Sequence, residues 1–270
     1  MVAARRSCSR SWSGPPPGDG PRATGGFGVR GPEYRFVGGA QLLCVRLATL
    51  LGDRVTLGAP VTAIEQHADG VRVVSTTTPA THEAKRVVLA LPPRLLRDVA
   101  IELPSAAREV VERGQVGGVV KCFAAYEQPF WRAAGLSGEA YRPHGDVRAT
   151  VALDGSGAAI LLAFVVGAAA RGWSARDRTE RKQAVLATLA EQFGPAALAP
   201  LDYAEHDWSH DPWSAGCVAS TAPGVTPGAW GAPHGRVHFA GTESARSWPG
   251  YMEGAIEAGE RAAAEVIAAR

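Results

Sequence analysis

The feature that most constrains this chain is the sequence VHFAGTESARSWPGYMEGAIEAGERAAAEVI, residues 237–267. An apolar strand runs into Gly241, where the missing side chain lets the backbone approach a ligand closely. A glycine-rich turn follows and feeds a helix. A glycine turn between a strand and a helix usually opens a nucleotide-binding domain, yet here it stands at the C-terminal end. The strand is typical of the buried centre of a sheet, so it must pair with strands from earlier in the chain.

The composition favours a packed core and argues against several classes of protein. Of the 270 residues, 46% are hydrophobic and 20% are charged, as in soluble globular proteins. The net charge of +2 is not gathered into a basic face, which argues against a nucleic-acid partner. No apolar run approaches the roughly 20 residues that span a bilayer, so we expect neither a membrane anchor nor secretion. The scattered cysteines favour a reducing, cytoplasmic location; they are Cys8, Cys44, Cys122 and Cys217.

Residues 1–33 differ from the rest, because glycine, proline, serine and arginine dominate them. We expect this segment to be disordered. It holds two strings that fit a dinucleotide fingerprint, GDGPRA (Gly18–Ala23) and GFGVRG (Gly26–Gly31). Neither string has the preceding strand and following helix on which the fingerprint depends, so we interpret both as coincidence.

From Tyr34 onward the pattern predicts a mixture of helices and strands, of the α+β class. YRFVGGAQLLCVRLATLLGDRVTL predicts a short strand, a glycine turn, an amphipathic helix and a second strand. VTAIEQH and VRVVST form a predicted hairpin around the turn Ala68–Gly70, and EAKRVVLALPP is a β-rich run ended by two prolines. Further predicted helices cover residues 105–113 and 176–193, and further predicted strands cover residues 119–126, 149–153 and 159–166.

Four separate stretches together resemble the flavin-containing amine oxidase family, monoamine oxidases in particular. They are EYRFVGGAQLLCVRLATLLGDRVTLGAPVTAIEQ, VGGVVKCFAAYEQPFW, DWSHDPWSAGCVAS and FAGTESARSWPGYMEGAIEAGERAA. They occur in order from about Tyr34 to Arg270, and their compatible spacing makes the resemblance far more specific than any single glycine pattern.

The resemblance implies a two-lobed, truncated amine-oxidase fold. In that family the FAD domain is discontinuous, and a C-terminal strand, turn and helix return to cover the ribityl and isoalloxazine parts. Residues 34–110 and 211–270 would then form the remnant of an α/β-type FAD-binding domain, and residues 111–210 a mixed-sheet substrate domain. A family member would need roughly 200 further residues before Tyr34, including the real glycine fingerprint, so we expect that N-terminal unit to be missing from this chain.

The resemblance also implies which residues meet FAD. Thr242 and Glu243 match positions at the flavin's phosphate and ribityl region, and Gly250 opens a helix whose unpaired amides suit the electron-rich edge of the ring. Without the resemblance, Gly241 and Gly250 would be an ordinary turn and helix start. The implied cofactor contacts are Val61, Cys217, Gly241, Thr242, Glu243, Gly250 and Met252.

Lys121 and Tyr251 are the implied catalytic residues. Lys121 lies on the apolar strand VVKCFAAY and matches the family lysine that holds a water against flavin N5; the alternative is a solubilising edge-strand lysine. Tyr251 matches one wall of the aromatic cage that steers the amine. Val218 stands where monoamine oxidases have the opposite tyrosine, so half the cage is missing. Phe164, Trp208 and Trp213 could line the cavity instead, but each is equally plausible as core.

The sequence also bears on covalent flavin attachment and on metal binding. Cys217 matches the cysteine that carries the covalent flavin bond in monoamine oxidases, but a lone cysteine is more often a small buried hydrophobe, so we favour non-covalent FAD. His206, His210 and Asp211 lack a third ligand at typical metal spacing, so we expect no metal.

The implied function is FAD-dependent oxidative deamination. The α-carbon of a neutral amine gives hydride equivalents to flavin N5, the imine hydrolyses to an aldehyde, and dioxygen is reduced to hydrogen peroxide. The small-molecule amine and dioxygen are the expected partners, and the resemblance leaves a homodimer open. The alternatives are an inactive fragment, a half-enzyme that needs a partner chain, or another flavoprotein oxidase or desaturase of the same fold. Lys121 and the WPGYMEG context favour the amine oxidase.

Overall fold

The computed structural model describes residues 36–77, 80–153, 159–217, 219–220 and 230–269. The predicted disordered segment, both glycine strings within it and Val218 lie outside the described residues. The chain divides into two compact units, residues 1–60 and 61–270. The predicted division into residues 34–110 with 211–270, and 111–210, stays a prediction.

The described part of the first unit contains helix α1 (Gln41–Leu51), which continues into the 3-10 turn η1 (Gly52–Arg54). The prediction of a strand on either side of this helix is wrong for the described residues. Gly38 and Gly39 have positive φ angles and turn the chain before α1. Val55 has extended backbone angles, but no strand among the described residues pairs with it. An extended segment without a ladder partner is not a strand.

The second unit begins with a four-stranded sheet in the order β3-β2-β1-β5. Its strands are β1 (Val61–His67), β2 (Gly70–Ser75), β3 (Thr81–Ala84) and β5 (Ala100–Ile101). The predicted hairpin is confirmed, because His67 pairs with Gly70 and the two strands run antiparallel. The 3-10 helix η2 (Pro93–Asp98) and helix α2 (Ser105–Arg113) follow, and α2 occupies the predicted residues.

Strand β13 (Val237–Phe239) pairs in parallel with β4 (Val87–Leu89). All three β13 side chains are buried, as expected for a strand covered on both faces. The predicted β-rich run over residues 83–93 contains the end of β3 and all of β4, which lie in different sheets because β3 pairs with β2 and β4 pairs with β13. Helix α6 (Met252–Ala268) follows β13 and contacts it. The core of this region contains Ile64, Val71, Leu89, Leu96, Leu103, Ala107, Val111, Trp230, Val237 and Phe239.

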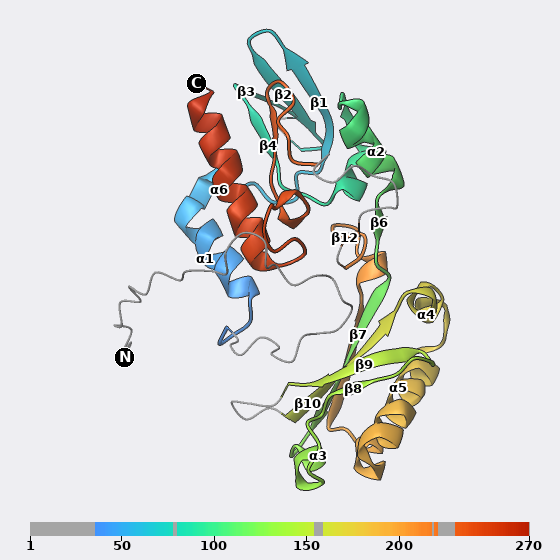
Figure 1. Cartoon of the computed structure of the whole chain (residues 1–270). Coiled ribbons are helices and arrows are strands. Elements are labelled where there is room, and N and C mark those ends of the chain that lie inside the picture. Colours follow the sequence, from blue (N-terminus) through green and yellow to red (C-terminus); the bar gives the residue numbers. More distant parts are fainter. Residues whose placement is uncertain (1–35, 78–79, 154–158, 218, 221–229, 270) are drawn as a thin grey trace, which may run out of the picture. The chain divides into compact units, whose positions relative to one another are not determined.

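A five-stranded antiparallel sheet has the order β11-β7-β10-β9-β8 (Figure 1). Its strands are β7 (Val119–Tyr126), β8 (Ala140–Tyr141), β9 (Val147–Ala152), β10 (Ala159–Val166) and β11 (Asp202–Asp207). Side chains of β7 alternate between buried and half-buried, so one sheet face is covered more fully than the other. The buried face packs with helix α5 (Arg178–Phe193), which begins two residues later than predicted because Asp177 caps it through Thr179 N.

Short elements complete the second unit. They are β6 (Gln115–Val116), which pairs with β12 (Ala219–Ser220), the helices α3 (Phe130–Ala133) and α4 (Ala168–Arg171), and the 3-10 turns η3 (Trp173–Ala175), η4 (Pro195–Leu198), η5 (Trp208–His210) and η6 (Thr242–Ser244). The predicted α+β class is confirmed by this mixture of helices with parallel and antiparallel pairs.

Candidate functional site

Strand β13 ends at a glycine with a backbone conformation that other residues rarely adopt. Gly241 has φ +91°, in the left-handed region. A Cβ atom at this position would lie 3.9 Å from backbone atoms of Ala90 and Leu91, just after β4, and 3.4 Å from Oε2 of Glu243. The ends of two parallel strands and a carboxylate therefore meet with little side-chain bulk between them. Ligands of parallel sheets bind at such carboxyl ends.

The hydroxyl of Thr242 joins this turn to the start of helix α6. Its Oγ1 donates to the carbonyl of Tyr251 over 3.0 Å and accepts from the backbone N–H of Gly250 over 2.6 Å. Gly250 has φ +86°, which allows the chain to turn sharply before the helix. Thr242 thus fixes the geometry of the loop between β13 and α6.

The carboxyl group of Glu243 is half-buried and has no side-chain partner among the described residues. Burial raises its pKa, and only a hydrogen bond from its own backbone N–H opposes that change. A partly buried charge without a partner costs stability. A ligand that donates hydrogen bonds beside Gly241 would remove that cost.

Arg261 of α6 holds the same loop from the other side. Its Nη2 donates to Phe239 O over 3.0 Å, to Ser244 O over 3.2 Å and to Ser244 Oγ over 3.0 Å. Its Nη1 donates to Gly231 O over 3.2 Å and pairs with Glu265 over 2.8 Å. The Arg261 side chain is 11% exposed. One side chain therefore connects the end of β13, turn η6 and helix α6.

The N-terminus of α6 carries an exposed aromatic pair. The rings of Trp248 and Tyr251 lie edge to face, with centroids 5.7 Å apart. Trp248 has φ +55°, an uncommon conformation for a large residue that stores strain in the turn. No side chain caps α6 at Tyr251, so the N–H groups of its first turn, which begins at Met252, need another acceptor.

A second group of site residues lies on the less covered face of the five-stranded sheet. Lys121 of β7 is in register with Phe164 of β10 on one side and with His206 of β11 on the other. Its Nζ lies 5.6 Å from the ring centroid of Trp208, within the range of a cation–π contact. The rings of His206 and Trp208 meet edge to face at 4.3 Å. These four side chains place one positive charge among aromatic groups.

Residues 24–267 match the family described as "Flavin containing amine oxidoreductase". The chain belongs to this family. It is 35% identical over 245 residues to the probable flavin-containing monoamine oxidase A of Dictyostelium discoideum, a match that covers 87% of this chain and 53% of the relative. It is 36% identical over 248 residues to flavin-containing amine oxidase B of Sus scrofa, covering 88% of this chain and 48% of the relative.

Solved structures of flavin amine oxidases share the fold of this amine oxidoreductase chain. A putrescine oxidase variant with redesigned cofactor binding has a TM-score of 0.80 and 34% identity, and it matches 87% of this chain and 54% of its own. Cyclohexylamine oxidase from Brevibacterium oxydans has a TM-score of 0.79 and 33% identity, covering 84% and 52%. The chain thus spans about half the length of the relatives it matches.

The loop after β13 fits the flavin that the family description implies. Gly241 leaves room for a ligand beside the backbone, Glu243 lacks a hydrogen-bond donor from another residue, and the first turn of α6 lacks a capping acceptor. FAD has ribityl hydroxyls that could donate hydrogen bonds to Glu243. It also has electron-rich ring atoms that could accept hydrogen bonds from the first turn of α6. All of these residues belong to this chain, so this part of the flavin site does not depend on the regions of the relatives that the chain does not cover.

The site residues predicted from the sequence fall into two groups. Gly241, Thr242, Glu243, Gly250, Tyr251 and Met252 are brought together in the loop and helix after β13. Lys121, Phe164 and Trp208 are brought together on the five-stranded sheet.

The remaining predicted residues have other surroundings. Val61 begins β1, where it pairs with Ser75. Cys217 is half-buried and its N–H donates to Gly117 O over 3.2 Å. Trp213 is 69% exposed. No described contact joins these three residues to either group, and their cofactor or cavity roles stay predictions.

Arg261, Glu265 and Asp207 hold the site in shape and were not predicted from the sequence. Arg261 and Glu265 form an i,i+4 pair on α6, which is a visible signal in a helical sequence. Asp207 caps turn η5, which carries Trp208, and an aspartate two residues before a serine in a turn is a recognisable capping pattern. The sequence shows these pairings but not the loops that α6 and η5 support, so it does not reveal that these residues position the site.

Two classes of site are not found in the described residues. His206 pairs with Asp211 at 3.9 Å and His210 with Asp207 at 2.8 Å, but no group of three or more metal-ligating side chains occurs there. Among the same residues, every helix is too short or too polar to cross a membrane.

Proposed function

We propose that this chain forms the flavin-proximal part of an FAD-dependent amine oxidase. The observation that carries the proposal is the loop after β13, where Gly241, the unpartnered Glu243 and the uncapped start of α6 lie together in a member of the flavin-containing amine oxidoreductase family. When bound, FAD would accept hydride equivalents from the α-carbon of an amine and pass the electrons to dioxygen.

The residues of this chain bind, orient and provide charge. Gly241 and the start of α6 would hold the flavin end of FAD, with Thr242 fixing the turn through its two hydrogen bonds. Trp248 and Tyr251 present aromatic faces that attract a polarised amine nitrogen. Lys121 supplies a positive charge on the sheet face and would hold a water by hydrogen bonding. Relatives named for monoamines, putrescine and cyclohexylamine support a primary amine as the substrate class.

The proposal is tested by joining residues 34–270 to the N-terminal part of a family relative that precedes the matched region. The purified fusion is loaded with FAD and mixed anaerobically with aliphatic, aromatic and diamine substrates in turn. We expect at least one amine to bleach the oxidised flavin spectrum, and dioxygen to restore it with formation of hydrogen peroxide. A fusion that is folded and loaded, but stays oxidised with every amine, would contradict the proposed activity.

A further inference from the structure

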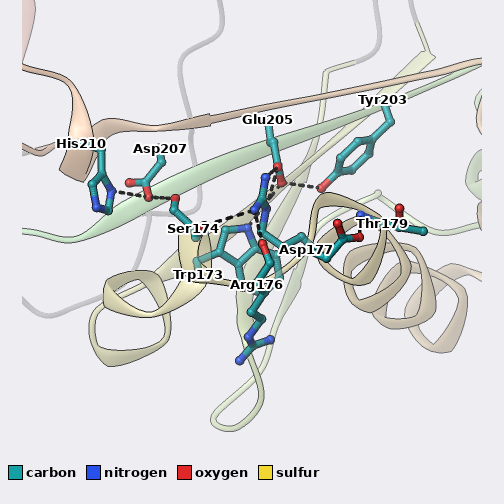
Figure 2. A network of polar contacts seen from close by, with 10 residues as sticks. Trp173, Ser174, Arg176, Asp177, Thr179, Tyr203, Glu205, Asp207 and His210 are labelled. Carbon is teal, nitrogen blue, oxygen red and sulfur yellow. Dashed lines mark hydrogen bonds and ion pairs between the residues drawn. The ribbon is translucent and has the colours of Figure 1, made fainter.

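A polar network surrounds Glu205 and Asp207 of the five-stranded sheet (Figure 2). Side chains alternate along β11, so His206 lies on the Lys121 face while Glu205 and Asp207 lie on the other. Glu205 is 11% exposed, and its Oε1 accepts from Arg181 Nε of α5 over 2.7 Å. Its Oε2 accepts from Trp173 Nε1 over 3.4 Å and from Tyr203 Oη over 3.2 Å. This edge strand is thereby attached to the helical layer behind it.

Asp207 ends the strand and makes the contacts that shape the next turn. Its Oδ1 accepts from the N–H of Ser209 over 2.9 Å, which caps turn η5. Its Oδ2 accepts from His210 Nδ1 over 2.8 Å and from the hydroxyl of Ser174 in η3. Burial alone would raise the pKa of Asp207, but hydrogen bonds from Ser174, His210 and Ser209 outweigh it and lower that pKa. The carboxylate is therefore ionised and holds three donors at once.

Trp208, the aromatic partner of Lys121, lies in the chain between Asp207 and two of these donors, Ser209 and His210. The indole Nε1 is buried and has no hydrogen-bond partner among the described residues, so no polar contact of its own fixes the ring. The carboxylates of Glu205 and Asp207 on β11 pair with Arg181 and His210, not with Lys121. The direction of the ammonium group therefore depends on where the Trp208 ring is held.

We propose that Asp207 is a positioning residue that fixes Trp208 against Lys121 from the opposite face of the sheet. It acts through the backbone of η5, because its hydrogen bonds with Ser209 N, Ser174 and His210 restrict the turn to one conformation. Whether the contact between Trp208 and Lys121 matters for amine oxidation rests on the proposed function. The contact itself is a property of the chain and is testable without cofactor or substrate.

The test uses the three lysines of the chain, Lys85, Lys121 and Lys182. Reductive methylation with 13C-formaldehyde places a dimethyl group on each Nζ for NMR and keeps the positive charge. Methyl groups above an indole ring are shifted upfield by its ring current. In the unsubstituted chain we expect the Lys121 signal upfield of the Lys85 signal, and Trp208→Leu should abolish that difference.

Asp207→Ala should move the Lys121 signal most of the way to its position in Trp208→Leu, because the turn loses its cap. Asp207→Asn should move it less, since asparagine also caps helical turns. The matched control is Asp177→Ala, which removes the same kind of cap from α5, where Asp177 Oδ1 accepts from Thr179 N over 2.7 Å. We expect the control to leave the Lys121 signal in place.

A Lys121 signal that stays in place in Asp207→Ala would overturn the proposal, and so would an equal shift in Asp177→Ala, which would indicate general loosening. If Asp207→Ala does not fold, the proposal is tested with Ser174→Ala, which removes one hydrogen-bond donor to Asp207. Ser174 is exposed, so this variant should fold. It should shift the Lys121 signal in the same direction, and no shift would overturn the proposal. Because this NMR test involves no flavin, a negative result would leave the amine oxidase proposal unaffected. A fusion that does not oxidise amines would likewise leave the proposed role of Asp207 unaffected.

Discussion

Lys121 is the residue on which the proposed reaction with dioxygen depends most. In a fusion loaded with FAD, we expect Lys121→Met to slow the reoxidation of reduced flavin by about tenfold or more, a loss of ~1.4 kcal/mol or more of transition-state stabilisation. Anaerobic reduction by amine should change much less, because the amine meets other residues. Stopped-flow absorbance measures the two half-reactions separately.

Lys182→Met is the control for Lys121→Met, since Lys182 also stands over an aromatic ring, 5.7 Å from the centroid of Tyr203, but on helix α5. It should leave both half-reactions unchanged. If Lys121→Met also leaves both unchanged, Lys121 is a solubilising strand lysine and has no part in the reaction.

Glu243 gives a pH-dependent prediction for the chain without cofactor. Burial raises the pKa of its carboxyl, so the folded state binds the proton more tightly than the unfolded state does. Stability should therefore fall as the pH rises from the unfolded pKa through the folded one. Glu243→Gln should raise the urea midpoint at pH 7, and the gain should vanish below about pH 4, where the native carboxyl is protonated. An equal gain at both pH values would show that charge is not the cause.

At the scale of elements, the start of helix α6 is packed closely against the loop that carries Trp248. A Cβ atom on Gly254 would overlap the carbonyl oxygen of Trp248 and lie 2.9 Å from Ala245 Cβ and from Ser247 O. Backbone atoms cannot move aside as a flexible side chain can, so Gly254→Ala should lower the free energy of unfolding by about 1–3 kcal/mol.

Gly259 provides the matched control on the same helix, because a Cβ atom there would meet nothing within 4 Å. Gly259→Ala should raise the free energy of unfolding by up to about 1 kcal/mol through helix propensity. Urea unfolding of both variants measures the difference. Two variants of equal stability would show that α6 does not press against this loop.

The elements also show what the sequence can and cannot predict. Helix α2 and strands β7 and β10 occupy the predicted residues, because their apolar periodicity is regular and each ends at a clear change of pattern. The run over residues 83–93 is β-rich as predicted, but its division between two sheets depends on pairing with β13, far along the chain, and was not predicted. Local patterns do not specify such long-range pairing.

The same distinction holds for the candidate site. Gly241, Thr242 and Glu243 stand out in the sequence because glycine and polar residues follow an apolar strand there. The roles of Arg261 and Asp207 become visible only when α6 and β11 are placed beside the loops that they hold. Positioning residues act through the backbone of other elements, so the spacing of residues along the chain does not reveal them.

At the scale of the whole molecule, the chain spans about half the length of its relatives, and it contains the loop after β13 that we propose to meet the flavin. The sequence around the glycine strings in residues 1–33 does not predict the strand and helix on which a pyrophosphate-binding site depends. We therefore expect FAD binding to need both this chain and a family N-terminal unit, since the contacts at the flavin end alone would be too few to retain the cofactor through purification.

The flavin absorbance of two purified proteins tests this central claim most directly. The 270-residue chain alone should be colourless, whereas its residues 34–270 joined to a family N-terminal unit should carry about one FAD per chain. A folded fusion without flavin absorbance would contradict the proposed cofactor site, and stoichiometric FAD on the chain alone would contradict the division of that site between two parts.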